Sequence, residues 1–440
     1  MKHTWIIASS ITLLMASLPA AENWPQFRGP EFNGSSPEAN LPTKFSKEEN
    51  VKWSVDMPGT GSSTPAIWGD HVFITSTDPT DKALEAFCLD RKTGKVLWKN
   101  TLKSEIQQDD RSNYAAPSPS TDGTRVIFFY GTGDLLAFDM DGKEIWKRNI
   151  QKDYGTFAFQ WTFSTSPVLF DGHVYMQVLQ RDVQARGRGF EDKPNESYVL
   201  SLDAATGKEV WRHIRPCEAV AESREAFTTP MIFNHDGKTQ LVICGGDCIS
   251  GHDIDAKGEE LWRWGTWNPK KIGHWRLVAS PVAGEGIALA CAPKKEPIYA
   301  VKLGGKGMLD DSALAWVSEE KAITSDVPTP IYYGGRFYIL NGNGPRPTLS
   351  CVKPATGEIV WSEVIGRTTF EASPTAADGK IYLMNHKGDV FVVKASDTYE
   401  LLHETSMGEE DAQFTRSTIA IAQENLFIRT NEKLYCIGKG

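Results

Sequence analysis

Arginine recurs in short stretches just before the Ser/Thr-Pro steps of the chain, and aromatic residues stand among them. A guanidinium group offers paired donors that match planar anions, and an aromatic side chain can stack on a flat ring. These residue types predict a site for a carboxylate- or sulfate-bearing ligand. The alternative is that the arginines pair with acids such as Glu225, Asp326 and Glu371 and join adjacent structural units. The predicted ligand-binding residues are Arg111, Tyr114, Trp161, Arg224, Trp275, Arg276, Arg367 and Arg416.

The same stretches hold candidates for acid–base chemistry. His274, with Glu225 or Glu371 as its partner, has the residue type needed for hydrolysis or β-elimination on an acidic sugar. Asp326 is a further catalytic candidate. The alternative for His274 is a hydrogen-bonded packing residue beside Trp275. The sequence shows no Ser-His-Asp order, phosphate loop or calcium loop.

A second group with possible chemistry is Cys244, Cys248 and His252, each separated from the next by three residues. On an extended strand Cys248 and His252 face the same side. A metal site would need a fourth ligand or an open position. A disulfide across the hairpin and two free buried thiols are the alternatives, so the sequence predicts no metal.

A long repeat supplies the elements that position these residues. Each unit has a Ser/Thr-Pro step, a Gly turn, a β-branched and aromatic strand, and then Asp-x-x-Thr-Gly-Lys-x-x-Trp. The clearest copies of the last motif are 90–98 and 203–211. Alternating strands separated by Gly turns are typical of β-sheets, and units that cannot bury their apolar face alone must stack.

Counting the units predicts an all-β fold, an eight-bladed β-propeller of four-stranded antiparallel blades at 51–440. Trp53 marks the fourth strand of a unit whose first three strands are missing before it. The last unit, 417–437, has no fourth strand after it. The ring is therefore expected to close by adding 51–55 to the last blade, which removes exposed sheet edges. A seven-bladed ring would leave Trp53 unpaired. In a propeller the stretches before the Ser/Thr-Pro steps crowd one mouth of the channel, and so does the blade 3 insertion 177–197.

The net charge disfavours one class of partner, and the positions of three cysteines indicate a structural role. The net charge is −9, which disfavours a nucleic-acid partner because phosphate binding needs a basic face. Cys88, Cys351 and Cys436 occupy one repeat slot that other copies fill with Ala or Ser. A slot of that kind is a tight core position, so these three cysteines are expected to be structural.

The first residues predict export. Residues 1–21 have a basic start, an apolar run and a small-residue exit, the layout of a signal peptide. No segment reaches the ~18 apolar residues that a membrane-spanning helix needs. The expected location is the periplasm or the exterior of the cell. Residues 22–50 are expected to be an irregular leader over the ring surface.

The Asp-x-x-Thr-Gly-Lys-x-x-Trp unit resembles the tryptophan-docking repeat of the pyrroloquinoline-quinone (PQQ) dehydrogenase superfamily. The resemblance covers nearly all of 51–437 and includes exported PQQ-like repeat proteins and the outer-membrane assembly-factor propeller, which binds no quinone. It implies the fold and docking of blade on blade by the Trp residues. The adjacent cysteines and the haem motif Cys-x-x-Cys-His of the family's alcohol dehydrogenases are missing here.

Three functions follow as hypotheses. The first is an exported, non-catalytic binding or scaffold module whose rim takes a protein, an anionic glycan or another carboxylate ligand; it is expected to be monomeric. The second is a quinoprotein-type oxidoreductase that holds PQQ at the Arg-rich mouth, with Ca²⁺ near Asp326. The third is a lyase or hydrolase on acidic polysaccharides that uses His274, Arg276 and Tyr114. The missing catalytic constellation favours the first.

Overall fold

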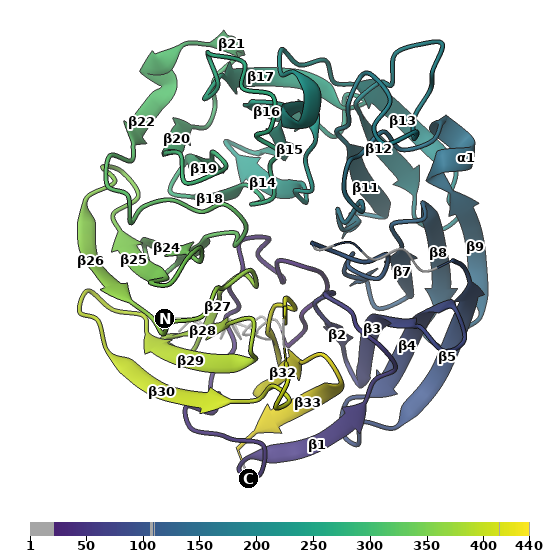
Figure 1. The fold of residues 1–440 in the computed structure, drawn as a ribbon, viewed down its shortest axis with the longest axis vertical. Coiled ribbons are helices and arrows are strands. Elements are labelled where there is room, and N and C mark those ends of the chain that lie inside the picture. Colours follow the sequence, from purple (N-terminus) through teal and green to yellow (C-terminus); the bar gives the residue numbers. More distant parts are fainter. Residues whose placement is uncertain (1–21, 106–108, 110, 413, 440) are drawn as a thin grey trace, which may run out of the picture.

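Each repeat unit forms one antiparallel sheet, and eight sheets stand around a central axis (Figure 1). Residues 22–105, 109, 111–412 and 414–439 are described in this computed structural model, so the predicted signal peptide lies outside the described residues. Inner strands such as His71–Asp78 are buried along most of their length because neighbouring blades cover both of their faces. The prediction of an all-β, eight-bladed propeller is confirmed.

Blades 1 to 3 are regular four-stranded sheets whose strands follow chain order. Blade 1 contains β2 (Ala66–Trp68), β3 (His71–Asp78), β4 (Ala83–Asp90) and β5 (Val96–Lys103). Blade 2 contains β6 (Ser120–Thr121), β7 (Arg125–Phe129), β8 (Asp134–Asp139) and β9 (Glu144–Asn149), followed by the helix α1 (Ile150–Tyr154). Blade 3 contains β10 (Val168–Phe170), β11 (His173–Val178), β12 (Tyr198–Asp203) and β13 (Glu209–Ile214).

Blades 4 and 5 depart from the repeat because a segment between two strands of blade 5 adds a fifth strand to the sheet of blade 4. Blade 4 follows the short helix η1 (Ala221–Arg224) and contains β14 (Met231–His235), β15 (Lys238–Gly245), β16 (Cys248–Asp253) and β17 (Glu259–Gly265). Blade 5 contains β18 (Val282–Gly284), β19 (Ile287–Cys291), β20 (Ile298–Lys302), the short helix η2 (Asp311–Ala313) and β22 (Leu314–Val317). Between β20 and β22 the chain adds β21 (Gly307–Leu309) to blade 4, parallel to β17. The four-stranded prediction therefore misses the fifth strand of blade 4, which replaces the usual Thr-Gly turn of blade 5.

Blades 6 to 8 complete the ring. Blade 6 contains β23 (Ile331–Tyr333), β24 (Arg336–Asn341), β25 (Thr348–Val352) and β26 (Ile359–Val364). Blade 7 contains β27 (Thr375–Ala377), β28 (Lys380–Met384), β29 (Asp389–Lys394) and β30 (Leu401–Ser406). Blade 8 contains β31 (Ala420–Ala422), β32 (Asn425–Arg429), β33 (Lys433–Gly438) and, as predicted, the N-terminal strand β1 (Val51–Asp56), which pairs antiparallel with β33.

The repeated Trp holds neighbouring blades together. The indole of Trp146 in blade 2 donates a hydrogen bond to the carbonyl of Ala204 in blade 3, at 2.9 Å. Its ring lies on Gly207, where an added Cβ would be 2.6 Å away. The motif therefore needs Gly both for its positive φ of 69° and for the close approach of the indole. Equivalent indole–carbonyl bonds join Trp53 to Arg91, Trp98 to Met140, Trp316 to Pro354, and Trp361 to Ser396.

The Ser/Thr residue of each Ser/Thr-Pro step joins the blades a second time, around the channel. In seven of the eight junctions its hydroxyl oxygen accepts the backbone N–H of the equivalent residue in the preceding blade, at 2.9–3.2 Å. At the remaining junction, Ser417 Oγ donates to the Ser63 carbonyl at 2.7 Å. We call the seven accepting residues the hydroxyl belt; they are Ser118, Ser166, Thr229, Ser280, Thr329, Ser373 and Thr418.

The leader does not lie only on the ring surface, because its first part enters the channel (Figure 1, purple). Trp24 is fully buried and pairs with Ile67 through two backbone hydrogen bonds of 3.0 and 2.8 Å. Arg28 donates to the carbonyls of Pro330 and Pro374, which begin the first strands of blades 6 and 7. Burial lowers the pKa of Arg28 to about 9. The leader closes the end of the channel opposite the Arg-rich stretches.

The seven cysteines are free, and Cys88, Cys351 and Cys436 are buried in the core of the blades. Each lies on the third strand of its blade and is paired across the sheet with an aromatic residue of the second strand, as Cys88 is with Phe73. Within the described part of the chain, no helix is both long and apolar enough to cross a membrane.

Candidate functional site: the open mouth of the channel

A cavity of about 160 Å³ occupies the channel at its Arg-rich mouth. Phe27 of the leader forms its floor, and the hydroxyl belt lies in its wall. The rim contains four of the eight predicted ligand-binding residues together with one acid. These rim residues are Arg111, Trp161, Arg276, Arg416 and Glu371. The loops from different blades thus meet at one cavity, as the propeller prediction requires.

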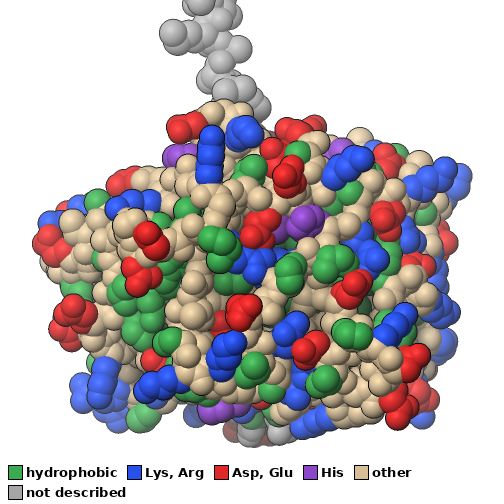
Figure 2. All heavy atoms as spheres, turned by 90° about the horizontal axis from the view of Figure 1, so that it is seen from above, with side chains coloured by type: hydrophobic (Ala, Val, Ile, Leu, Met, Phe, Trp, Pro, Cys, Tyr) green, Lys and Arg blue, Asp and Glu red, His purple; other side chains and the backbone are tan. Residues whose placement is uncertain are grey.

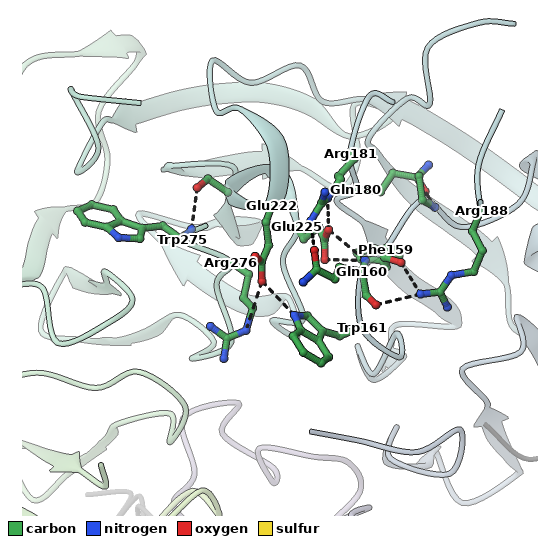
Figure 3. Close-up of polar contacts among 12 residues, drawn as sticks. Phe159, Gln160, Trp161, Gln180, Arg181, Arg188, Glu222, Glu225, Trp275 and Arg276 are labelled. Carbon is green, nitrogen blue, oxygen red and sulfur yellow. Dashed lines mark hydrogen bonds and ion pairs between the residues drawn. The ribbon is translucent and has the colours of Figure 1, made fainter. Parts of the chain in front are cut away.

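Arg276 is the rim residue with the clearest unused donor. Its side chain is only 8% exposed, and its Nη1 has no hydrogen-bond partner among the described residues. Its Nε lies 4.0 Å from Glu222 Oε1, which also accepts the indole N–H of Trp161 at 3.0 Å. Figure 3 shows the Glu222 carboxylate between the two side chains, with a dashed line to each. A buried donor without a partner is costly, so an anionic group in the cavity would stabilise it.

Two hydrogen bonds hold the loop that carries Arg276. Ser223 Oγ accepts the backbone N–H of Trp275 at 2.8 Å, and the N–H of Leu277 donates to the Glu225 carbonyl at 3.0 Å. Both acceptors lie in or directly after η1. Trp275 itself is buried with the apolar core of blades 4 and 5 and does not line the cavity. The Arg276 backbone is therefore fixed before any ligand binds.

Two guanidinium groups lie near the Trp161 ring. Arg111 lies 5.9 Å and Arg186 lies 5.1 Å from the ring centroid. Asp109 orients this pair because its carboxylate accepts the N–H of Thr162 at 2.7 Å and the N–H of Arg111 at 2.8 Å. Burial acts to raise the pKa of Asp109, but these and further hydrogen bonds outweigh it, and the net shift is downward. Cations on an aromatic face add to the positive character of the rim.

Glu371 is the acid among the described rim residues, and it contacts the Arg416 guanidinium and the His386 imidazole. Arg416 Nε donates to Glu371 Oε2, and His386 Nε2 lies 3.1 Å from the same oxygen. Burial acts to raise the pKa of Glu371, but His386 and Arg416 outweigh it and lower the pKa to about 2. The predicted partner His274 is exposed instead. His386 lies between the second and third strands of blade 7. Loops of this kind are expected at this mouth, so the sequence position of His386 could have identified it as a candidate site residue.

Glu225 joins blades 3 and 4 and lies beneath the rim. Its fully buried carboxylate accepts a hydrogen bond from Arg181 and the N–H of Gln160 at 3.1 Å (Figure 3). Burial raises the pKa of Glu225 to about 7, although Arg181 opposes the shift. Arg188 donates to the Phe159 carbonyl. These arginines of the blade 3 insertion therefore have structural partners, as the alternative of paired arginines predicts.

The other predicted site residues lie away from the cavity. Arg224 donates to the Ala219 carbonyl at 3.0 Å and pairs with Asp182 at 3.5 Å. Asp326 accepts the backbone N–H of Lys294 at 2.9 Å and the side-chain amide of Asn343 at 3.1 Å. Arg367 is exposed and Tyr114 is half-buried against Gly131. None of these residues lines the cavity.

The Cys/His group in blade 4 has no free metal-binding nitrogen. His252 is fully buried, with Nε2 2.9 Å from Ser250 Oγ and Nδ1 3.0 Å from the Gly258 carbonyl. Burial lowers the pKa of His252 to about 3, so the ring is neutral. Cys244 and Cys248 are both buried free thiols. Among the described residues, no group of three or more His, Cys, Asp or Glu side chains could hold a metal ion.

The cavity fits part of the quinone hypothesis. Arg276 and Trp161 match the carboxylates and the flat ring of PQQ. The accompanying Ca²⁺ does not fit the described residues, because it takes six to eight oxygen ligands. Glu371 is the one carboxylate among the described lining residues, and it already pairs with Arg416 and His386. We therefore derive no catalytic step through a quinone and its metal.

Comparison with known proteins places the chain among propellers. The sequence profile of a family described as outer membrane protein assembly factor BamB matches residues 45–188 and 252–438. A polyvinylalcohol dehydrogenase from a Pseudomonas species is 24% identical over 211 residues, which cover 47% of this chain and 30% of that relative. The chain thus matches less than a third of that relative's length.

Two solved structures share the fold at low sequence identity. A europium-containing methanol dehydrogenase superposes with a TM-score of 0.66 at 12% identity, covering 92% of this chain and 89% of that chain. BamB from Moraxella catarrhalis superposes with a TM-score of 0.56 at 13% identity, covering 88% and 96%. Identities this low establish the fold alone.

Proposed function

The chain belongs to the PQQ-like β-propeller family whose profile is described as outer membrane protein assembly factor BamB, and from this premise we propose that it is a binding module for a carboxylate-bearing ligand. The ligand occupies the mouth of the channel, with a carboxylate on Arg276 and its body against Trp161. The signal-like segment 1–21 supports a role outside the cytoplasm.

One observation carries this proposal: Arg276 is buried, and its Nη1 is unpaired among the described residues at the edge of a cavity. Hydrogen bonds to charged groups are stronger than neutral ones, and an unpaired buried donor carries its full desolvation cost until a ligand arrives. The remaining rim cations are Arg111 on Trp161 and Arg416 on Glu371. They give the mouth a positive rim on a chain whose net charge is −9.

A second candidate function is oxidation of an alcohol. The likeness to a polyvinylalcohol dehydrogenase over 47% of the chain favours it. The shortage of carboxylates for a metal among the described lining residues counts against it. A binding module needs only the guanidinium and aromatic groups at the rim, so it requires fewer assumptions.

The test is a titration of the purified protein with carboxylate probes, followed by tryptophan fluorescence and by calorimetry. The probes are PQQ, with and without Ca²⁺, and galacturonate oligomers. We expect saturable binding of at least one probe and a loss of about tenfold or more in affinity in Arg276→Gln. The matched control is Arg336→Gln in blade 6, whose side chain pairs with Asp397 of blade 7 at 2.9 Å and does not line the cavity.

Two results would overturn the binding proposal. One is that no carboxylate probe binds; the other is that Arg276→Gln binds as tightly as the wild type. Reduction of an artificial electron acceptor by the protein with PQQ, Ca²⁺ and an alcohol would instead favour the oxidoreductase.

A further inference from the structure

The hydroxyl belt has hydrogen-bond donors that the protein does not use. All seven belt residues line the channel cavity. Each hydroxyl oxygen accepts one backbone N–H, as Ser280 Oγ accepts from Thr229 at 2.9 Å. A hydroxyl that accepts still carries its own O–H proton. None of the seven donates a hydrogen bond to any residue that the structure describes, so up to seven O–H donors can turn toward one cavity.

The leader makes this part of the channel a closed end. Phe27 lies beneath the belt, and Arg28 stacks on it with its guanidinium carbon 5.6 Å from the ring centroid. The carbonyls of Pro330 and Pro374 hold Arg28 in place. The leader therefore stands between the belt and the opposite end of the channel. Donors at a closed, partly apolar end interact more strongly with an anion than donors in open water.

The cavity thus has two places for negative charge. Arg276 offers its unpaired Nη1 at the rim, and the belt offers O–H donors below it. Among the described residues that line the cavity, Glu371 is the one acid, and it already pairs with Arg416. A ligand with a single carboxylate can satisfy only one of the two places.

We propose that the hydroxyl belt is a second oxyanion site, so that the ligand of this channel is a small di- or polycarboxylate. One carboxylate lies on Arg276, and another lies among the belt hydroxyls above Phe27. This inference rests on the proposed binding function and specifies its ligand class.

The test compares dicarboxylates with their monomethyl esters, which remove one charge at nearly the same size. Malonate, succinate, glutarate and adipate, each with its ester, are titrated by calorimetry. We expect one chain length to bind best, and to bind about tenfold or more tightly than its own ester. The wild-type comparison needs no variant and so does not depend on the folding of one.

A variant pair then assigns the second carboxylate to the belt. Thr329→Val removes one belt hydroxyl and keeps the shape of the side chain. It should weaken the best dicarboxylate about tenfold and leave the ester unchanged. The control is Thr375→Val, since Thr375 Oγ1 is buried without a hydrogen-bond partner among the described residues and lies outside the cavity lining. Thermal unfolding of both variants checks that they are folded.

The outcomes separate the two proposals. If dicarboxylates and esters bind equally and Arg276→Gln abolishes both, the belt is not an oxyanion site and the binding function stands. The belt inference is equally overturned if Thr329→Val and Thr375→Val bind the best dicarboxylate alike. If no carboxylate binds at all, both proposals fail.

Discussion

Two glutamates near the channel mouth have opposite pKa shifts, because their partners differ. Glu225 is fully buried beside one guanidinium, and burial raises its pKa to about 7. Glu371 pairs with both His386 and Arg416, which outweigh burial and hold its pKa at about 2. The first carboxyl therefore titrates near neutral pH, whereas the second stays ionised.

The raised pKa of Glu225 predicts a loss of stability as the pH rises. The folded state holds this proton more tightly than the unfolded state, whose pKa is near 4.5. The stabilising contribution is complete below about pH 4.5 and is lost as the pH rises through about 7. Glu225→Gln should remove this part of the pH dependence, measured as the thermal midpoint from pH 4.5 to 8. Glu358→Gln, at an exposed pair with Lys353, is the control. Equal slopes in wild type and Glu225→Gln would contradict the assignment.

The lowered pKa of Glu371 predicts the opposite behaviour at low pH. Its stabilising contribution is present above the ordinary value of 4.5 and is lost as the pH falls toward 2. Glu371→Gln should lower the unfolding free energy at pH 7 by roughly 1–3 kcal/mol, because Arg416 and His386 lose a charged partner. The difference should shrink at pH 3 in urea unfolding. A difference that is the same at both pH values would rule out the ionised pair as its cause.

At the scale of the elements, the docking motif depends on a glycine that carries two constraints. Gly207 has a φ of 69°, and an added Cβ would lie 2.6 Å from the Trp146 ring. Gly172 in the first turn of the same blade has a φ of 72° but no atom within 4 Å of an added Cβ. Comparing substitutions at the two glycines therefore distinguishes the cost of backbone strain from the cost of steric contact.

Gly207→Ala should destabilise the protein more than Gly172→Ala does. Both substitutions strain the backbone by about 1 kcal/mol. Gly207→Ala also displaces the Trp146 indole, which we expect to add roughly 1–3 kcal/mol. Denaturant unfolding of both variants measures the difference. If the two variants lose the same free energy, the indole contact contributes nothing measurable.

The outer strands carry little information about function. Figure 2 shows one side of the ring, where acidic and basic side chains are interspersed between small apolar areas. On that side charge of one sign does not dominate. The binding proposals concern the channel, because the unpaired Arg276 nitrogen and the belt hydroxyls line one cavity there.

At the scale of the whole molecule, the leader forms a clasp, by which we mean that its backbone hydrogen bonds join blade 1 to blade 7. Trp24 pairs with β2 in blade 1, whereas Gly34 and Ser36 bond to Ala376 in blade 7. The strand β1 closes blade 8 in the same region of the chain. Segments from both ends of the sequence are therefore tied to one another, and we expect the ring to unfold as a unit.

Trp24→Ala tests the clasp. Trp24 is fully buried, so truncation should cost about 3–5 kcal/mol. Guanidinium unfolding followed by circular dichroism should show a lower midpoint and still a single transition. Val183→Ala, whose side chain is 61% exposed, should leave the midpoint unchanged. A separate early transition in Trp24→Ala would instead mean that the leader unfolds independently of the ring.

The blade count and the ring closure were predictable from sequence because they depend on local patterns. Each unit repeats the same turn residues and the same Trp. The N-terminal unit has only its fourth strand and the last unit lacks only its fourth strand, so the two together make one complete blade that closes the ring. The extra strand β21 was not predictable, because its Gly-rich segment has no apolar alternation and its pairing is with another blade. The Ser/Thr-Pro steps marked strand starts in the sequence, but their bonds between blades exist only in the ring.

The sequence by itself thus determined the architecture and which loops reach the channel mouth. Only the tertiary structure decided which arginines face the cavity, because a guanidinium follows whichever partner the fold brings near. Arg181 pairs with Glu225, 44 residues away, and Arg416 with Glu371, 45 residues away. Arg276 keeps an unpaired nitrogen, since the fold places its nearest acid, Glu222, at 4.0 Å and against Trp161. The entry of Phe27 into the channel likewise has no local pattern, because it depends on carbonyls that the ring alone assembles.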